Sequence, residues 1–307
     1  MTIEIRQVAE ETYAIDCGSD PIFGLRQVAY LLVDEMPALI DPGYTSSAAR
    51  LLNNSAQLDL QRLSYIIPTH IHLDHGGGSG YLAQQIPEST FVFHPRGAGH
   101  ATEPSRLIKS FRRVFGEQFE DSLGPVLPVP PDRIHVASDG ETIRLGRRQL
   151  ALHFAPGHAP HHLAIQDSLT GALFCGDALG YISDDTADIP FPTGLPPFDP
   201  VAYQRTIDKL ASLSPKVLCY AHHGARNEVQ RLIRQVKDLS TAFSDIVQKA
   251  LDAGEDDKRI SERILQYAKA YSSQKQLPII IEASVSGYIA YFRSKKQPPQ
   301  STNESVT

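Results

Sequence analysis

One short segment of the chain gathers four side chains of the kinds that bind transition metals. His70, His72, Asp74 and His75 stand in an H-x-H-x-D-H pattern. At this chain's content of histidine and aspartate, such a string arises by chance in about one chain in a thousand. Three imidazoles and a carboxylate suit zinc, iron or manganese. The segment therefore predicts a metal site, and the proline before it and the glycines at 76–78 predict a tight loop rather than a helix there.

Two more candidate ligands stand at the ends of predicted strands. Asp177 closes the apolar run 173–175, and His222 follows the run 217–220. Because α/β folds place their sites where buried strands end, we expect both side chains to join the site. Two divalent ions that share a water lower its pKa towards neutral and so supply a nucleophile for hydrolysis.

The elements that must position these residues follow from the hydrophobic pattern. Short apolar or β-branched runs closed by turn residues predict strands, and apolar residues at helical spacing predict helices. Strands are expected at 13–17, 28–33, 38–40, 65–67, 91–93, 133–136, 142–145, 149–154, 163–166, 172–175 and 217–220. Helices are expected at 46–53, 80–85, 106–115, 200–212, 227–249 and 260–270. The interleaving favours an α/β class with helices covering the sheets.

Taken in order, the motifs resemble those of the metallo-β-lactamase superfamily. Besides H-x-H-x-D-H, the matching segments are Asp41-Pro42-Gly43, Pro156-Gly157-His158, Gly176-Asp177 and His222-His223-Gly224. The resemblance covers residues 13–224 and implies an αββα sandwich of two mixed β-sheets flanked by helices, with a C-terminal helical extension. It divides the chain into a metal-hydrolase domain at 1–225 and a helical extension at 226–294 packed on it. The polar segment 295–307 is expected to be a disordered tail.

The resemblance also implies a complete dinuclear ligand set. His70, His72 and His158 would form one site, Asp74, His75 and His222 the second, and Asp177 would bridge them. We expect two divalent ions, zinc first, with iron or manganese as alternatives. Asp74 is also the candidate catalytic proton acceptor. His222 is preferred to His223 because the family's histidine precedes one spacer residue and a glycine.

Other side chains are candidates for supporting roles or substrate contact. Asp41 either caps its loop or orients a metal-binding imidazole. His161 and His162 lie too close to His158 to share its metal, which leaves them supporting or substrate-contacting roles. Arg96 either meets an anionic substrate group or is a solvated loop residue.

A proline-rich segment begins five residues after the bridging aspartate. Residues 182–200 contain five prolines and are expected to form an irregular loop. Phe191 and Phe198 within it either wall the substrate pocket as part of a lid or anchor the loop to the C-terminal helices.

The predicted reaction is hydrolysis of an ester, thioester, lactone or related acyl bond by a metal-bound hydroxide. Two alternatives stay open. One is a mononuclear iron sulfur dioxygenase on the same fold, and the other is a non-enzymatic metal-containing ligand-binding or signalling protein.

The amino-acid composition limits the kinds of binding partner that the protein is expected to have. Lys and Arg number 29 against 35 Asp and Glu, for a net charge of −6, which argues against nucleic-acid binding by bulk charge. No signal peptide and no apolar run of about 20 residues is visible, so no membrane partner is expected. Three scattered cysteines fit a reducing compartment. We expect a cytoplasmic protein with a small-molecule substrate, whose C-terminal helices cover the active-site mouth or form a homodimer surface.

Overall fold

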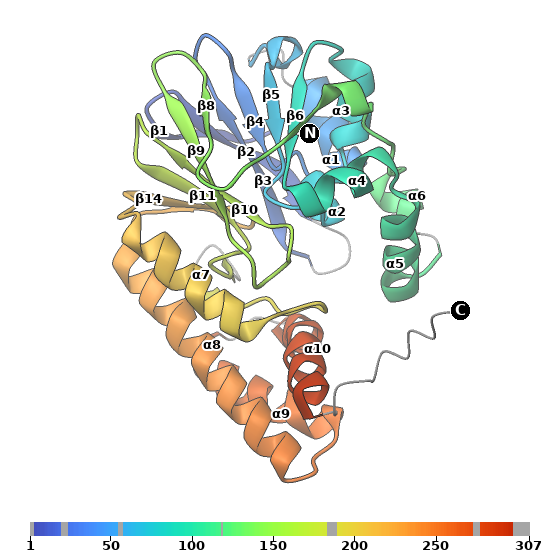
Figure 1. The fold of residues 1–307 in the computed structure, drawn as a ribbon, viewed down its shortest axis with the longest axis vertical. Helices are drawn as coiled ribbons and strands as arrows, with labels where there is room; N and C mark the ends of the chain where they lie inside the picture. Colours follow the sequence, from blue (N-terminus) through green and yellow to red (C-terminus); the bar gives the residue numbers. More distant parts are fainter. Residues whose placement is uncertain are drawn as a thin grey trace, which may run out of the picture.

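A computed structural model of the chain describes residues 3–19, 24–54, 58–117, 119–182, 189–272 and 277–296. Two β-sheets pack face to face in the upper part of Figure 1, and helices cover the outer face of each sheet. The predicted αββα sandwich with C-terminal helices is confirmed. No helix in the described ranges combines the length and the hydrophobicity needed to cross a bilayer.

The first sheet has seven strands whose spatial order follows the chain. The first four pair antiparallel, and each later strand adds parallel to its predecessor. The parallel half needs crossover connections, which the helices between its strands supply. The strands are β1 (Ile5–Ala9), β2 (Thr12–Ser19), β3 (Arg26–Leu32), β4 (Ala38–Ile40), β5 (Tyr65–Ile67), β6 (Thr90–Phe93) and β7 (Ile134–Val136).

The second sheet has six strands in the order β15-β14-β11-β10-β9-β8. Only β11 and β14 pair parallel in it, because α7 (Pro200–Ser212) carries the chain back across the sheet. The strands are β8 (Thr142–Arg144), β9 (Gln149–Phe154), β10 (Leu163–Asp167), β11 (Ala172–Gly176), β14 (Val217–Tyr220) and β15 (Gly224–Arg226).

The central strand β3 explains why four layers form. Its residues are apolar on both faces: Ala29 and Leu31 join the cluster under the first helical layer, whereas Tyr30 and Leu32 join the cluster between the sheets. A strand that is apolar on both faces must be covered twice. The second sheet is covered on its outer face in the same way by a helical cluster.

The helices form an outer layer on each sheet. The first sheet carries α1 (Thr45–Asn54) and α3 (Ser79–Gln85), with the 3-10 turn η1 (Leu60–Arg62) beside them and η2 (Pro131–Arg133) before β7. The second sheet is covered by α7 and the long α8 (Val229–Asp252), on which α9 (Asp257–Ala268) and α10 (Leu277–Lys296) pack. The expected tail at 295–307 lies outside the described residues except for Lys295 and Lys296, which end α10.

Three local expectations differ from the structure. The H-x-H-x-D-H segment is not all loop, because α2 (Leu73–Gly76) makes one helical turn that contains Asp74 and His75. The segment after β6 is helix α4 (Pro95–Thr102) rather than loop, because Pro95 fits the first helical position and the His94 ring accepts the Arg96 N–H. The proline-rich segment contributes two short paired strands, β12 (Tyr181–Ile182) and β13 (Pro190–Phe191), and its residues 183–188 lie outside the described part of the chain.

Two further helices follow α4, and the second of them packs against α1. The basic, amphipathic α5 (Ser105–Phe115) is followed by α6 (Phe119–Leu123). In Figure 1, α5 and α10 come from distant parts of the sequence and flank the space below the sheets. Both helices contribute to the cavity described next.

Candidate metal centre

The candidate ligands converge at the ends of four strands. The segment with His70 leaves β5, His158 lies in the turn between β9 and β10, Asp177 follows β11, and His222 follows β14. Gly157 allows the His158 turn, because a Cβ there would lie 2.4 Å from the Cα of Tyr203 in α7. The sandwich therefore brings together side chains that are far apart in sequence.

Three imidazoles form the first group of ligand atoms. His70 Nε2 lies 2.8 Å from His72 Nδ1, and His158 Nε2 lies 3.2 and 3.1 Å from these two atoms. Burial holds the pKa of His72 at about 3 and that of His70 well below its ordinary value, and it also lowers the pKa of His158. Where the nitrogens of three neutral rings meet, an N–H group of one ring donates well to only one other nitrogen, so hydrogen bonds among the rings leave the third nitrogen unsatisfied. A metal ion at their meeting point would satisfy all three.

A second group of ligand atoms lies beside the first. His75 Nε2 and His222 Nε2 are each 3.5 Å from Asp74 Oδ2. Burial opposes ionisation of Asp74, yet the two histidines outweigh it and hold the carboxyl pKa well below its usual value. Burial also opposes charge on the imidazoles, but the carboxylates raise the pKa of both His75 and His222. In the metal-free protein this group therefore binds protons that a metal ion would displace.

Asp177 lies between the two groups and presents one oxygen to each. Its Oδ2 is 3.6 Å from His158 Nε2, while its Oδ1 is 3.7 Å from His75 Nε2 and 3.8 Å from His222 Nε2. The Oδ1 atom and His75 Nε2 are buried, and neither has a hydrogen-bond partner among the described residues. Orphaned buried polar atoms are rare in folded proteins unless a ligand or ion completes them. These donors fit divalent metal ions on both sides of Asp177.

Asp41 contacts the His75 ring of the second group on the side away from Asp74. It has a left-handed backbone, with φ 51°, and accepts the Thr69 N–H at 2.6 Å and the Thr69 hydroxyl at 3.0 Å. Its Oδ2 lies 3.2 Å from His75 Nδ1. A carboxylate in this place fixes the ring tautomer that leaves Nε2 free for a metal.

Three supporting side chains were not predicted from the sequence. Thr193 places its Oγ1 2.5 Å from His158 Nδ1, and Gln27 donates its amide to the Asp74 carbonyl at 3.1 Å. Thr69 lies directly before the first histidine, so adjacency to the motif was the one available hint. Thr193 and Gln27 reach the site only through the tertiary fold.

The adjacent histidines of the last motif point in different directions. His222 is 3% exposed and faces Asp74. His223 has φ 60°, and its ring accepts the Arg26 N–H at 3.4 Å in a shallow pocket away from the site. Of the other adjacent pair, both rings stack on His70, with ring centroids 6.1 Å away for His161 and 4.7 Å away for His162. His162 also accepts the Asp177 N–H at 3.1 Å.

A cavity of about 670 Å³ opens above the ligand groups. Its floor contains His72, Asp74, His158, Asp177 and His222. Its walls come mainly from α4, α5, α10 and the segment 193–197, and Arg96 and His161 line it. A volume of this size falls within the range of small-molecule sites, about 300–1,000 Å³.

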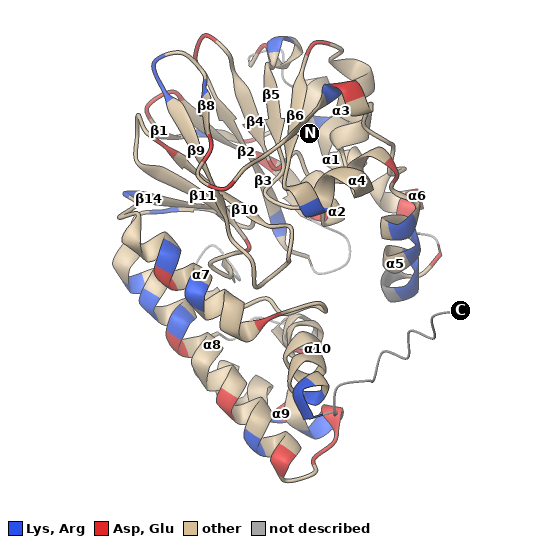
Figure 2. Cartoon of the chain, in the orientation of Figure 1, with Lys and Arg blue, Asp and Glu red and all other residues tan. Residues whose placement is uncertain are grey.

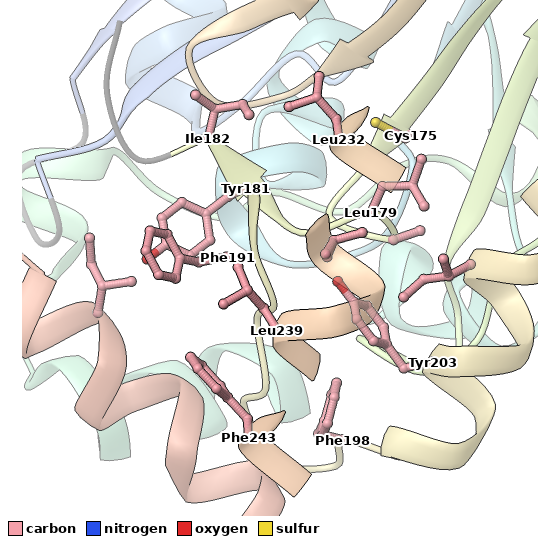
Figure 3. Packing of buried hydrophobic residues seen from close by; sticks show 14 of the residues in the cluster. Cys175, Leu179, Tyr181, Ile182, Phe191, Phe198, Tyr203, Leu232, Leu239 and Phe243 are labelled. Carbon is pink, nitrogen blue, oxygen red and sulfur yellow. The ribbon is translucent and has the colours of Figure 1, made fainter. Parts of the chain in front are cut away.

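The two phenylalanines expected to wall the pocket do not line this cavity. Phe191 is fully buried and Phe198 is 4% exposed, and both belong to the core under the second helical layer. Figure 3 shows Phe191 beside Tyr181, and Phe198 near Tyr203. Phe198 also packs 4.5 Å from the ring of Tyr288 in α10. The lid prediction for these rings is wrong, and the alternative that they anchor the loop fits these contacts.

Comparison with known proteins agrees with this geometry. A metallo-beta-lactamase fold-containing protein of Sulfurisphaera tokodaii is 27% identical over 214 residues, covering 69% of this chain and 78% of that protein. A hydroxyacylglutathione hydrolase of Aeromonas salmonicida is 27% identical over 190 residues, or 60% of this chain, and the chain spans 56% of that relative. The structure of a metallo-beta-lactamase family protein from Thermus thermophilus superposes with a TM-score of 0.70 at 21% identity, over 94% of this chain and 95% of the other. The Metallo-beta-lactamase superfamily model matches residues 22–222, which is more than half of the chain. The protein belongs to the metallo-beta-lactamase superfamily.

Proposed function

We propose that the protein is a dinuclear metal-dependent hydrolase that cleaves an ester or thioester. The observation that carries the proposal is the pair of ligand groups that share Asp177 at the floor of one cavity. The superfamily consists mainly of metal-dependent hydrolases, and the chain keeps a full set of metal-binding side chains for this chemistry.

The proposed ligand assignment follows the distances. His70, His72 and His158 hold one ion, Asp74, His75 and His222 hold the other, and Asp177 contacts both. We propose zinc, with iron or manganese as alternatives, because imidazole and carboxylate accept all three. When bound, such ions acidify water and polarise a carbonyl group.

The chain's own residues would bind, orient and move protons. Asp74 lines the cavity as a carboxylate, so it is the proposed acceptor for the proton that a water molecule loses. Thr193 and Asp41 hold the rings of His158 and His75 from behind. A substrate that fills the cavity would displace water from it and so strengthen electrostatic interactions at its floor.

Among the candidate acyl bonds we favour a thioester, because of the names of the matching relatives. The hydroxyacylglutathione hydrolases that match are named for hydrolysis of an acylated thiol, although the match covers about half of each. The test is metal content by elemental analysis combined with turnover of acyl thioesters and esters. We expect about two ions per chain and metal-dependent hydrolysis, which His72→Ala abolishes and His223→Ala leaves largely intact.

The same experiment separates the alternatives. A protein that never binds more than one ion tightly, and that consumes oxygen with a persulfide when loaded with iron, is the sulfur dioxygenase instead. A protein that binds metal but turns over no acyl substrate favours the ligand-binding alternative.

A further inference from the structure

Much of the lining of the cavity above the metal centre is apolar. Ile280 and Ala283 of α10 and Leu195 of the proline-rich segment line it, and Leu107 and Phe111 of α5 line it as well. A surface of this composition is stabilised when an apolar chain of a ligand displaces water from it.

The rim of the same cavity is cationic. Arg96 of α4 and Arg106 of α5 line it together with His100. Among the described residues that line the cavity, the only carboxylates are those of the metal-site residues Asp74 and Asp177. Within the described ranges, neither arginine has a carboxylate within ion-pair distance. Figure 2 shows Lys and Arg residues, coloured blue, along α5. This patch stands out in a chain whose net charge is −6.

Arg96 is held in place by its helix. The His94 ring caps α4 by accepting the Arg96 N–H at 3.0 Å, and the next residue, Gly97, packs against Ile71 and His161 beside the metal centre. A Cβ on Gly97 would lie 2.8 Å from the Ile71 side chain, so α4 approaches the site closely. Arg96 is exposed, and a guanidinium group can pair with an oxyanion in a bidentate geometry.

We propose that the substrate is an amphiphilic anion whose apolar chain lies against α10 and whose carboxylate or phosphate group binds Arg96 and Arg106. This inference rests on the proposed function, because the acyl bond to be cleaved would lie between these two parts, at the metal centre. It names the substrate class as an acyl compound with an apolar chain and a separate oxyanion.

Binding of uncleavable probes tests the charge without requiring turnover. The probes are 2-(octylthio)acetate, the neutral alcohol 2-(octylthio)ethanol and octylphosphonate, titrated by calorimetry into zinc-loaded protein. We expect at least one of the two anions to bind about tenfold or more tightly than the neutral alcohol, the size of one charge-assisted hydrogen bond. Which anion binds better distinguishes a carboxylate from a phosphate group.

Two arginine variants locate the anion. The double change Arg96→Gln and Arg106→Gln should remove the preference for the anions. Arg113→Gln is the matched control, because Arg113 is exposed on the same helix and does not line the cavity. If the double variant keeps the full preference, the anion is held by the metal centre and the inference is wrong.

The apolar wall has its own test. Ala283→Phe should weaken binding of the octyl probes about tenfold and leave 2-(ethylthio)acetate unchanged, whereas Ala290→Phe on the exposed face of α10 should change neither. Melting temperatures of all variants check that they fold. Equal losses of affinity for the octyl and ethyl probes in the Ala283→Phe variant would show that the apolar chain of the ligand does not lie against α10. If the protein shows these binding preferences but cleaves no ester or thioester, the result supports the amphiphilic binding site and contradicts the proposed function.

Discussion

At the scale of single residues, the site depends on hydrogen bonds made behind the ligands. His158 has its Nδ1 within reach of the Thr193 hydroxyl at 2.5 Å and of the Thr193 carbonyl at 3.3 Å. These contacts fix the ring so that Nε2 faces His70 and His72. Partners of this kind set the tautomer and the orientation of a metal-binding imidazole.

Thr193→Val tests this role. The variant keeps the shape of the side chain and removes the hydroxyl, so we expect zinc affinity to fall about tenfold or more while the melting temperature of the metal-free protein changes little. Competition with a chromophoric chelator measures the affinity. Thr193→Ser is the control and should bind zinc like the parent chain. Unchanged affinity in the valine variant would show that the carbonyl contact alone positions His158.

The adjacent pair His222 and His223 gives a second residue-scale prediction. His222→Ala removes the Nε2 atom that lies 3.5 Å from Asp74 Oδ2, so it should lower the metal content by about one ion per chain. His223→Ala removes a ring that contacts the Arg26 N–H and should leave the metal content intact. Elemental analysis after gel filtration measures both. The opposite pattern would assign the ligand to His223.

At the scale of elements, α10 reaches the metal centre through one loop. Gly287 in α10 lies against Gly194, so closely that a Cβ on Gly287 would stand 1.8 Å from the Gly194 carbonyl oxygen. Gly194 directly follows Thr193, which holds His158. The C-terminal helices are therefore joined to the ligand set by two backbones in direct contact.

The variant Gly287→Ala tests whether α10 positions the loop that carries Thr193. The added methyl group has no space, so we expect a loss of about 1–3 kcal/mol in the free energy of unfolding together with weaker zinc binding, because the loop with Thr193 must move. Urea denaturation and chelator competition measure the two effects. Ser286→Ala, at an exposed position of the same helix, is the control. Loss of stability with unchanged zinc affinity would mean that α10 supports the fold without positioning His158.

Sequence patterns predicted some elements well for a physical reason. β4, β5, β9 and β14 have the predicted bounds, because short apolar runs closed by turn residues fit buried strands. α7 also has its predicted bounds, since Asp199 caps it and Pro200 begins it. The ligand residues could be proposed because their motifs are local and specific.

Other elements carried too little local signal. α10 is apolar around most of its circumference, as buried residues such as Ile280, Ile281 and Tyr288 show, so no single face stands out in the sequence. Phe191 and Phe198 sit in a proline-rich segment, and only the position of α8 and α10 decides that their rings are core rather than cavity wall. Thr193 likewise acquires its role from the tertiary fold.

At the scale of the whole molecule, the two sheets are joined at both ends by polar groups. At the end away from the metal centre, the fully buried Arg148 precedes β9 of the second sheet and donates to Thr12 of the first sheet at 3.2 Å. Its guanidinium group also lies 3.6 Å from the carboxylate of Asp167 in the second sheet. At the metal centre, the carboxylates and imidazoles come from both sheets. A metal ion bound there would add stability to the folded state, because the unfolded chain does not hold the ligands together.

Without metal, the buried imidazoles should make the whole molecule sensitive to acid. Burial holds the pKa of His72 at about 3 and that of His161 at about 2, whereas both rings take a proton near pH 6.5 in the unfolded chain. Below pH 6.5 the unfolded state therefore binds more protons than the folded state, and stability falls as the pH falls. His75 and His222 act in the opposite sense, because carboxylates raise their pKa; their contribution is complete below pH 6.5 and is lost as the pH rises.

The stability of the metal-free protein should therefore be highest near pH 6.5 and decrease on the acid side by up to about 1.4 kcal/mol per pH unit for each buried neutral ring. Urea denaturation of chelator-treated protein at pH 6.5, 5.5 and 4.5 measures this slope. His161→Phe removes one such ring while keeping an aromatic group on the cavity wall, so its slope should be shallower than that of the parent chain. Equal slopes for the two proteins would mean that His161 accepts a proton in the folded state, and that water reaches its ring within the cavity.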